Sequence, residues 1–519
     1  MTTDASPPEN DISSRLPETV ISGIISAFLH DDAPENTIKK SSKGKMRLII
    51  MWFSNIREFL SPKQHKGNKI IHSKSLTLTG MSSHSSIKAT LLLLGGLLLT
   101  GCGYRAPLYK SYIPEVNDST AYPGVRAGYK QLAALAEKDT GMKPSLGNTV
   151  TVIKDGKENL DMLTEDLRNA QISAYIEPYR FRLDTTGAAL KDILQEKAQA
   201  GVDIRLILDK SANIRKDRKE LRKLRDFGAH VYTFNRPAFW MDRHLPGLAT
   251  HRDHRKLTIL DGSIAYVGSR NIQDKYFFDW HDVDIRVTGP VIEDLTESFR
   301  RTYSLVKLRP EELYLAPDLA GTARRDSISG KRQFFDVPMQ VVPETPADRK
   351  LPIRNCLEWA IGHATDYFWF YNPYTPSPAS TIKALAEAAR RGVDVRWIVP
   401  GVNDIGPEKG MAESMYEELL DAGVRIYEWQ EHTMHAKQYL SDDYLMIIGS
   451  ANLDNLSLFL NYEMVTVLYD EQVCRLYKDV FLSDIEQHCV EVSPDQVHRW
   501  TPLHRIRNWL IRRFGGFFG

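Results

Sequence analysis

The chain has 519 residues and a nearly balanced charge, with 67 Lys and Arg residues against 66 Asp and Glu residues. A net charge of +1 provides no global positive field, which excludes the general electrostatic attraction typical of nucleic-acid-binding proteins. The 4 cysteines include no C-x2-C pair, so a zinc site is unsupported, and the length accommodates two domains.

The first 80 residues are polar and rich in Ser and Lys, and we expect them to be disordered or to be an extension that the native protein lacks. The next segment, 81–101, has a short basic start, an apolar run and a small residue before Cys102, which is typical of a secretory signal. The apolar run of about 11–13 residues is shorter than the roughly 20 that a spanning helix needs. Met81 is therefore a candidate for the true first residue.

The tetrapeptide Leu99-Thr-Gly-Cys102 resembles the bacterial lipobox. The resemblance implies cleavage before Cys102 and a diacylglycerol thioether on its sulfur, so that several acyl chains anchor the protein to a membrane. Gly103 favours sorting to the outer membrane over the inner membrane, with the protein facing the periplasm. In that compartment Cys474 and Cys489 could form one disulfide.

Two similar α/β segments make up most of the remaining chain. The predicted parts in chain order are a linker (102–145), a first domain (146–319), a polar connection (320–332), a second domain (333–490) and a basic, aromatic tail (491–519). In both domains Gly-Val-Asp, at Gly201 and at Gly392, ends a predicted helix and begins a buried strand. The alternation of strands and helices predicts a tandem α/β fold with mostly parallel sheets, in which a pseudo-twofold axis brings both halves to one site.

One motif, H-x-K-x4-D-x6-G-S-x-N, occurs once in each predicted domain, 181 positions apart (435 − 254). The first copy comprises His254, Lys256, Asp261, Ser269 and Asn271. The second copy comprises His435, Lys437, Asp442, Ser450 and Asn452. A carboxylate follows each asparagine by eleven positions, Asp282 in the first domain and Glu463 in the second. Two copies with the same spacing predict one active site made of two half-sites.

The chemistry of these residue types favours phosphodiester transfer. In H-x-K the two side chains share one face of a strand. A neutral imidazole is a nucleophile near pH 7 and an imidazolium is an acid there, so two histidines suffice without a metal or cofactor. Lys256 and Lys437 would place positive charge on the phosphate oxygens, and the motif asparagines would add amide donors.

Other residues near the motifs are read differently. Asp261 and Asp442 fall where a strand meets a turn, which favours a turn or ion-pair role. No G-x-S-x-G elbow surrounds Ser269 or Ser450, so a phosphate-binding or structural role is favoured over a nucleophilic one. Three histidines lie off the pattern and are read as ordinary polar residues or substrate-channel contacts: His251, His281 and His432.

Two segments have a composition that suits lipid. About ten residues are inserted in the first domain around Arg236–Thr250, and this apolar loop either contacts acyl chains or packs on its own core. The C-terminal segment Trp500–Gly519 interleaves arginines with Trp and Phe. It suits an anionic lipid interface, or else it forms a helix packed on the domain with a frayed end.

The paired motifs resemble those of the phospholipase D superfamily, over roughly residues 150–490. The resemblance implies a phosphohistidine intermediate, formed by one histidine while the other protonates the leaving oxygen, and His254 is favoured as the nucleophile. Asp282 and Glu463 resemble the family's carboxylate partners of the catalytic imidazole, which implies that they hold and orient an imidazole. The segment Gly268-Ser-Arg-Asn-Ile-Gln-Asp-Lys-Tyr-Phe277 looks like that of the C-type bacterial cardiolipin synthases. These transfer a phosphatidyl group from phosphatidylethanolamine, or in other types from phosphatidylglycerol, to phosphatidylglycerol. Leu456 stands where relatives often have arginine, which puts the donor in doubt.

Other functions remain open from the sequence. A phospholipase D hydrolase would use the same residues and release phosphatidic acid. Nucleases of the superfamily often carry one motif per chain and dimerise, whereas this chain carries both half-sites. We therefore expect the phospholipids of a membrane, rather than nucleic acid, as its partners. The sequence leaves the oligomeric state open. A scaffold with a decayed site is disfavoured because both motifs are intact.

Overall fold

The computed structural model describes residues 115–116, 118, 120–234, 251–307, 313–317, 332–374, 377–402 and 406–515. The expected extension (1–80), signal segment (81–101), lipidation site at Cys102 and inserted loop Arg236–Thr250 lie outside the described residues. All described residues belong to one compact unit, Gly95–Gly519.

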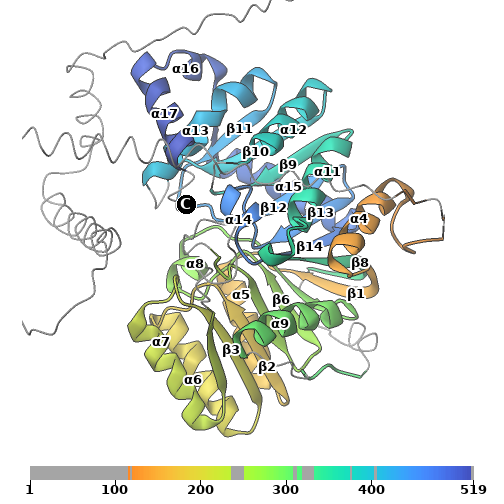
Figure 1. The fold of residues 1–519 in the computed structure, drawn as a ribbon, viewed down its shortest axis with the longest axis vertical. Helices are drawn as coiled ribbons and strands as arrows, with labels where there is room; N and C mark the ends of the chain where they lie inside the picture. The colour runs from red at the N-terminus through yellow and green to blue at the C-terminus, as the bar shows by residue number, and fades with distance from the viewer. Residues whose placement is uncertain are drawn as a thin grey trace, which may run out of the picture. The chain divides into compact units, whose positions relative to one another are not determined.

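Within the described residues, fifteen strands form one continuous mixed sheet (Figure 1). The strands are β1 (Ser145–Val152), β2 (Ser173–Pro178), β3 (Asp203–Asp209), β4 (His230–Phe234), β5 (Lys256–Leu260), β6 (Ile264–Gly268), β7 (Asp284–Thr288), β8 (Arg332–Glu344), β9 (Tyr367–Tyr371), β10 (Asp394–Pro400), β11 (Arg425–Trp429), β12 (Gln438–Ser441), β13 (Leu445–Gly449), β14 (Glu463–Tyr469) and β15 (Cys489–Glu491). Their spatial order is β15-β11-β10-β9-β12-β13-β14-β8-β1-β7-β6-β5-β2-β3-β4.

The sheet order shows the internal repeat. Read outward from the centre, the first half runs β1-β7-β6-β5-β2-β3-β4 and the second half runs β8-β14-β13-β12-β9-β10-β11, with β15 added at the edge. The antiparallel β1–β8 pair joins the halves, so the pseudo-twofold axis passes between these two strands. The expected α/β class and the two tandem domains are confirmed.

The strand directions differ in part from the expectation. Only β2-β3-β4 and β9-β10-β11 pair in parallel within the described sheet. The motif strands β5, β6, β12 and β13 pair antiparallel with their neighbours. The cause is local: β5 and β6 are joined by a tight turn at Asp261–Gly262, and a tight turn can connect only antiparallel strands.

Helices cover both faces of the sheet. They are η1 (Ala127–Tyr129), α4 (Lys130–Thr140), α5 (Gly156–Asn169), α6 (Thr185–Gln199), α7 (Arg215–Arg222), η2 (Lys223–Phe227), α8 (Asp274–Phe278), α9 (Val291–Lys307), η4 (Pro346–Asp348), α11 (Pro352–His363), α12 (Ala379–Arg390), α13 (Gly406–Asp421), α14 (Asn455–Phe459), α15 (Glu471–His488), α16 (Pro494–His498) and α17 (Pro502–Gly515). Among the described residues, no helix combines the length and the apolar character needed to cross a bilayer.

Alternation of side chains along the strands builds a separate core on each face. In β9, Phe368 and Phe370 pack into the core under α11–α13, while Trp369 and Tyr371 pack into the core shared with α9 and α15. The shared core contains residues of both halves, which ties the halves together. A third core lies under α5 and α6 of the first half.

Two further expectations differ from the structure. The stretch 102–145, expected as a linker, contains α4, whose buried Leu132 and Leu135 pack into the second-half core. Cys474 and Cys489 are free thiols at opposite ends of α15. Fifteen helical residues span roughly 22 Å at 1.5 Å per residue, far beyond the ~7 Å limit for bridged Cα atoms, so the expected disulfide cannot form here.

Candidate active site

Both motif histidines lie at the centre of the structure, each fixed by the opposite half. His254 precedes β5, and its backbone N–H donates to the carbonyl of Tyr462 at 2.9 Å. His435 precedes β12, and its backbone N–H donates to the carbonyl of His281 at 2.7 Å. Both imidazoles are buried. The two halves therefore meet at the histidines themselves.

Each imidazole is held by a carboxylate from the other half. Nδ1 of His254 lies 2.9 Å and 3.0 Å from the two carboxylate oxygens of Glu463. Nδ1 of His435 lies 2.8 Å from Oδ1 of Asp282. The sequence spacing identified both carboxylates, but it could not tell which imidazole each one holds. The crossed pairing leaves Nε2 of each ring as the nitrogen available for chemistry.

The motif serines hold these carboxylates. Ser269 Oγ donates to Asp282 Oδ1 at 2.5 Å, and Ser450 Oγ donates to Glu463 Oε2 at 2.5 Å. Ser457 of α14 adds a further hydroxyl to Glu463 Oε1 at 2.6 Å. Of the two roles that the sequence left open for these serines, phosphate binding and structural support, the hydrogen bonds to Asp282 and Glu463 fit structural support.

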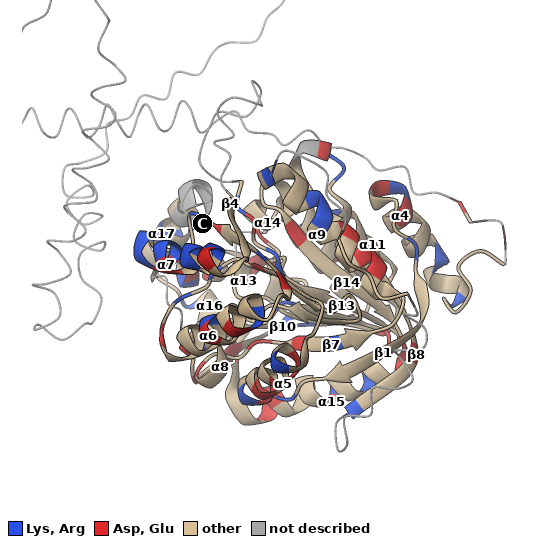
Figure 2. Ribbon diagram, turned by 90° about the horizontal axis from the view of Figure 1, so that it is seen from below, with Lys and Arg blue, Asp and Glu red and all other residues tan. Residues whose placement is uncertain are grey.

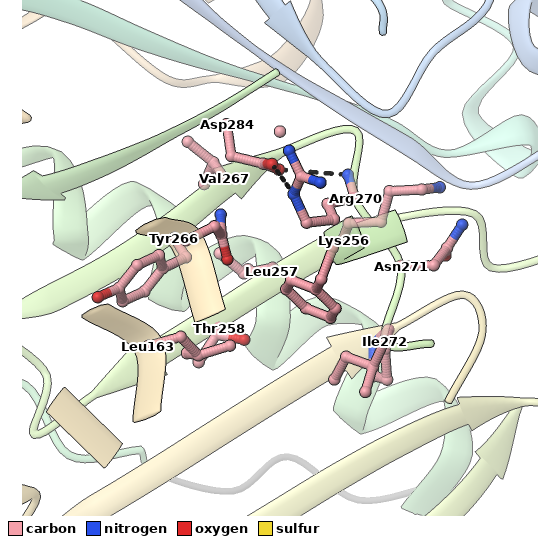
Figure 3. Close-up of a pocket in the computed structure, with 14 residues that line it drawn as sticks. Leu163, Lys256, Leu257, Thr258, Tyr266, Val267, Arg270, Asn271, Ile272 and Asp284 are labelled. Carbon is pink, nitrogen blue, oxygen red and sulfur yellow. Dashed lines mark hydrogen bonds and ion pairs between the residues drawn. The ribbon is translucent and has the colours of Figure 1, made fainter. Parts of the chain in front are cut away.

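The motif lysines are buried beside the imidazoles. Lys256 Nζ donates to the carbonyl oxygen of His254 at 2.5 Å, and Lys437 Nζ makes the equivalent bond to the carbonyl of His435. Figure 3 shows the Lys256 amine and the Asn271 amide extending in the same direction, away from Leu163 and Thr258. These residues also line a cavity of about 40 Å³, which has room for about one water molecule and none for a phospholipid.

Burial keeps the two imidazoles neutral near pH 7 and makes the two lysines lose their protons more readily than exposed lysines do. Burial lowers the pKa of His254 to about 4 and the pKa of His435 to about 3, although each carboxylate partner acts in the opposite direction. Burial also lowers the pKa of Lys256 to about 8 and of Lys437 to about 7. A neutral imidazole that donates Nδ1–H to a carboxylate has a free electron pair on Nε2, as a nucleophile at phosphorus requires.

The motif aspartates form turns away from the chemistry. Asp261 has a positive φ of 49°, and its carboxylate accepts the backbone N–H groups of Gln171, Ile172 and Ser173. Asp442, with a φ of 52°, accepts those of Thr365, Asp366 and Tyr367. Each aspartate therefore fixes the start of the strand that pairs with its motif strand.

Two arginines that sequence reasoning missed hold the carboxylate segments. Arg255 donates from Nε to the carbonyl of Glu463 at 3.1 Å and from Nη2 to the carbonyl of Glu344 at 3.0 Å. Arg270 donates from Nη2 to the carbonyl of Asp282 at 2.9 Å and pairs with Asp284 at 2.7 Å. Both arginines occupy the variable positions of the first motif, where the second motif has alanine. The presence of arginine in one motif copy and alanine in the other is the feature of the sequence that could have identified these two residues.

A family profile described as "Cardiolipin synthase, PLD-like domain" matches residues 163–303 and 357–485, one match in each half and together more than half of the chain. The chain belongs to this family. Cardiolipin synthase 2 of Bacillus anthracis is 29% identical over 380 residues, which cover 72% of this chain and 71% of the relative. A probable cardiolipin synthase of Bacillus subtilis (strain 168) is 26% identical over 417 residues, which cover 78% of each chain.

A solved structure has the same fold. The phosphatidylserine synthase of Haemophilus influenzae Rd KW20 superposes with a TM-score of 0.53 at 16% identity, over 75% of this chain and 98% of that chain. The comparison supports the tandem phospholipase D-like architecture. In the described parts of this family member, no group of His, Cys, Asp and Glu side chains has metal-binding geometry.

The off-pattern histidines of this phospholipase D-like site have distinct environments. His281 stacks on Trp429 with ring centroids 4.6 Å apart, and its Nε2 lies 3.4 Å from Asp484. It thus packs between the halves rather than facing substrate. His432 is exposed and His251 is half-buried.

The lowered lysine pKa values predict a fall in activity on the alkaline side. The ammonium of Lys437 attracts the anionic phosphodiester and is lost in the free protein as pH rises through about 7, followed by that of Lys256 near 8. We expect kcat/KM to fall by about tenfold per pH unit between pH 7 and 8, and by up to about a hundredfold per unit above pH 8, where both ammonium groups are being lost. Lys437→Arg keeps its charge, so its alkaline limb should move to higher pH even if its maximum is lower. A pH–rate profile of both forms checks this, and a wild-type profile that is flat from pH 6 to 9 would contradict it.

Proposed function

We propose that this protein transfers a phosphatidyl group from one phospholipid to the free glycerol hydroxyl of phosphatidylglycerol and thereby forms cardiolipin. The observation that carries the proposal is the pair of buried imidazoles, each with Nδ1 bound to a carboxylate of the other half. The family and its cardiolipin synthase relatives support a phospholipid as the source of the phosphodiester. The donor is phosphatidylethanolamine or a second phosphatidylglycerol.

In the first step Nε2 of His254 attacks phosphorus and forms a P–N bond. The P–O bond to the donor's head-group alcohol breaks, and that oxygen takes a proton from Nε2 of His435. The bound phosphate anion raises the pKa of His435 above its value in the free protein, because its charge stabilises the imidazolium. Asp282 stabilises the same imidazolium through Nδ1–H.

In the second step the acceptor hydroxyl attacks phosphorus and gives its proton to His435. A new P–O bond forms, the P–N bond to His254 breaks, and both histidines return to their starting states. The products are cardiolipin and glycerol or ethanolamine, according to the donor. Lys256, Lys437, Asn271 and Asn452 stabilise the negative charge on the phosphate oxygens in both steps.

The test is a lipid assay on the purified full chain. Labelled phosphatidylglycerol is supplied with and without phosphatidylethanolamine, beside the His435→Ala variant as the control. We expect labelled cardiolipin from the wild type alone, and a dependence on phosphatidylethanolamine would identify the donor. Phosphatidic acid without cardiolipin would mean a hydrolase, and no lipid turnover would contradict a phospholipid substrate.

We also propose that Cys102 carries a lipid anchor and that the protein faces the periplasm, at the outer membrane. The lipobox-like Leu99–Cys102 supports this placement. We expect the native protein to incorporate labelled palmitate and to partition into detergent, and Cys102→Ser to lose the label. An unlabelled wild-type protein would refute the anchor, and density-gradient separation of the two membranes tests the sorting.

The C-terminal helix offers a second membrane contact, and we propose that it binds an anionic bilayer surface. Its polar side is fixed to α13, where His504 and Arg507 bind Glu413 at 3.0 Å and 2.9 Å. Leu503, Ile506 and Trp509, at i, i+3 spacing, are 50%, 49% and 60% exposed. The helix contains four arginines and no acidic residue; Arg505 and Arg507 pair with Glu417 and Glu413 of α13, and the net positive charge of the helix sequence suits anionic headgroups.

In a Cys102→Ser background, we expect Leu503→Ser, Ile506→Ser and Trp509→Ser together to reduce co-sedimentation with phosphatidylglycerol vesicles at least fivefold. The reason is the loss of the apolar row that enters the interface. Phe335→Ser, which removes an exposed aromatic residue of β8, is the matched control. Equal binding of the triple variant and the control would contradict a role for α17.

A further inference from the structure

The active site is electrically asymmetric although its motifs are symmetric. Arg180 follows β2, and Arg252 lies two residues before His254. The repeat places Thr375 and Thr433 at the matching positions of the second half, so both arginines are confined to the side of His254. A pair of arginines on one side of the centre, with threonines at the matching positions of the other half, indicates that the two sides bind unlike groups.

Both arginines are fixed through their backbones. Arg180 N–H donates to Asn271 Oδ1 at 3.2 Å, and its carbonyl accepts the N–H of Ile272 at 3.0 Å. The carbonyl of Arg252 accepts the N–H of Tyr462 at 2.8 Å, the same residue that accepts from His254. The two side chains are therefore attached to the segments that hold the motif asparagine and the first imidazole.

Their guanidinium groups are incompletely paired. Nε of Arg180 and Nε of Arg252 are buried and have no hydrogen-bond acceptor among the described residues. Arg255, Arg270 and Arg286, by contrast, each lie beside a buried or half-buried carboxylate. A buried donor without an acceptor is energetically unfavourable, and more so when it is charged, so an anionic ligand at this place would remove that cost.

Tyr179 connects these arginines to the reacting centre. Its hydroxyl lies 3.5 Å from Nη1 of Arg252, and its ring lies 4.5 Å from the imidazole of His254. Lys256 Nζ lies 5.2 Å from the centre of the same ring. Burial, and to a smaller extent the positive charge of Arg180, lowers the pKa of Lys256. The arginines thus adjoin the catalytic centre.

The side of His435 has a different character. Three aromatic rings, those of Tyr276, Trp280 and Tyr374, lie 5.3–5.6 Å from its imidazole. The repeat places Ser457 and Asn461 at the positions of Tyr276 and Trp280 in the second half. Lys275 also lies on this side, with Nζ 3.4 Å from the ring centre of Trp280, so its ammonium already contacts an aromatic face. The buried and incompletely paired arginines lie on the side of His254, which favours that side for an additional phosphate.

We propose that Arg180 and Arg252 form a second phosphate subsite, which binds the phosphodiester of the acceptor lipid while the reacting phosphodiester lies between His254 and His435. The inference rests on the proposed transfer to an anionic lipid, because such an acceptor carries its own phosphate one glycerol unit from the attacking hydroxyl. Guanidinium groups bind phosphate oxygens through paired N–H donors. The acceptor phosphate keeps all its bonds, and only the P–N bond to His254 is exchanged for the new P–O bond.

The subsite predicts a selective loss in Arg180→Gln/Arg252→Gln. The full-length variant is given labelled phosphatidylglycerol in mixed micelles together with ethanol, a neutral acceptor that has no phosphate. We expect the ratio of cardiolipin to phosphatidylethanol to fall at least tenfold, with phosphatidylethanol formed within threefold of the wild-type rate. Arg425→Gln, which removes an exposed arginine that pairs with Glu491 at 2.8 Å, is the matched control and should leave the ratio unchanged.

Each outcome is decisive. An unchanged ratio would overturn the subsite in either of two ways. If both products fall equally, the arginines act at the reacting phosphate, and if neither product falls, they do not bind the acceptor. If the melting transition shows that the double variant does not fold, the ratio of cardiolipin to phosphatidylethanol is measured for Arg252→Gln alone. A wild-type protein that forms neither product would overturn the proposed transfer and, with it, this inference.

Discussion

His254→Ala and His435→Ala are each expected to lower the rate of lipid turnover by at least about 10⁴-fold. Each change removes a group that the mechanism uses twice, once in forming and once in resolving the phosphohistidine. The fall in rate should therefore exceed that caused by removing a general acid or base that acts in one step. The measurement is the initial rate of product formation by purified variants whose melting temperatures match the wild type.

The two histidine variants should differ in the covalent intermediate. His254→Ala has no nucleophile, so no labelled phosphoenzyme is expected after rapid quenching at alkaline pH. His435→Ala retains the nucleophile and lacks the group that activates the acceptor, so any label that forms should persist. His432→Ala, which removes an exposed histidine near the second motif, is the control and should behave as the wild type. Full activity in either active-site variant would rule out the two-histidine mechanism.

The sequence predicts the members of the site because their spacing along the chain can be read directly from it. Two copies of one motif at equal spacing predict a shared centre, and resemblance to the family predicts that the carboxylates eleven residues after each asparagine, Asp282 and Glu463, hold an imidazole. The turn signal at Asp261–Gly262 also correctly marked the ends of the motif strands. The same turn makes β5 and β6 antiparallel, and this local constraint prevails over the parallel pairing that the α/β pattern of the whole domain predicts.

The crossing of the two halves was beyond sequence reasoning. The contact between His254 and Glu463 joins residues 209 positions apart, and it depends on how β1 and β8 place one half against the other. Arg255 illustrates the same limit. Its position between His254 and Lys256 looks like a solvated strand residue, but it is buried and bound to the carbonyl of Glu463. A pattern within one half cannot report a partner supplied by the other.

Glu463→Gln and Asp282→Asn are expected to lower the rate on phospholipid by about 10³- to 10⁴-fold, through different histidines. An amide in place of the carboxylate no longer stabilises the imidazolium and can favour the wrong tautomer of the ring it contacts. In the crossed arrangement Glu463→Gln impairs the nucleophile His254, whereas Asp282→Asn impairs the acid His435. Proximity in the sequence alone would instead assign Asp282 to His254 and Glu463 to His435.

A substrate with a good leaving group separates these possibilities. A phosphatidyl ester of p-nitrophenol needs little protonation as it departs, so its release should depend weakly on the general acid. We expect Asp282→Asn and His435→Ala to regain at least a hundredfold of their lost rate in the first burst of p-nitrophenol, while Glu463→Gln and His254→Ala regain little. Recovery by Glu463→Gln instead would mean that Glu463 serves the acid, and it would refute either the crossed pairing or the assignment of His254 as nucleophile. Since the carboxylate and the histidine of each pair come from opposite halves, matching behaviour within each pair would also show that neither half is catalytic without the other.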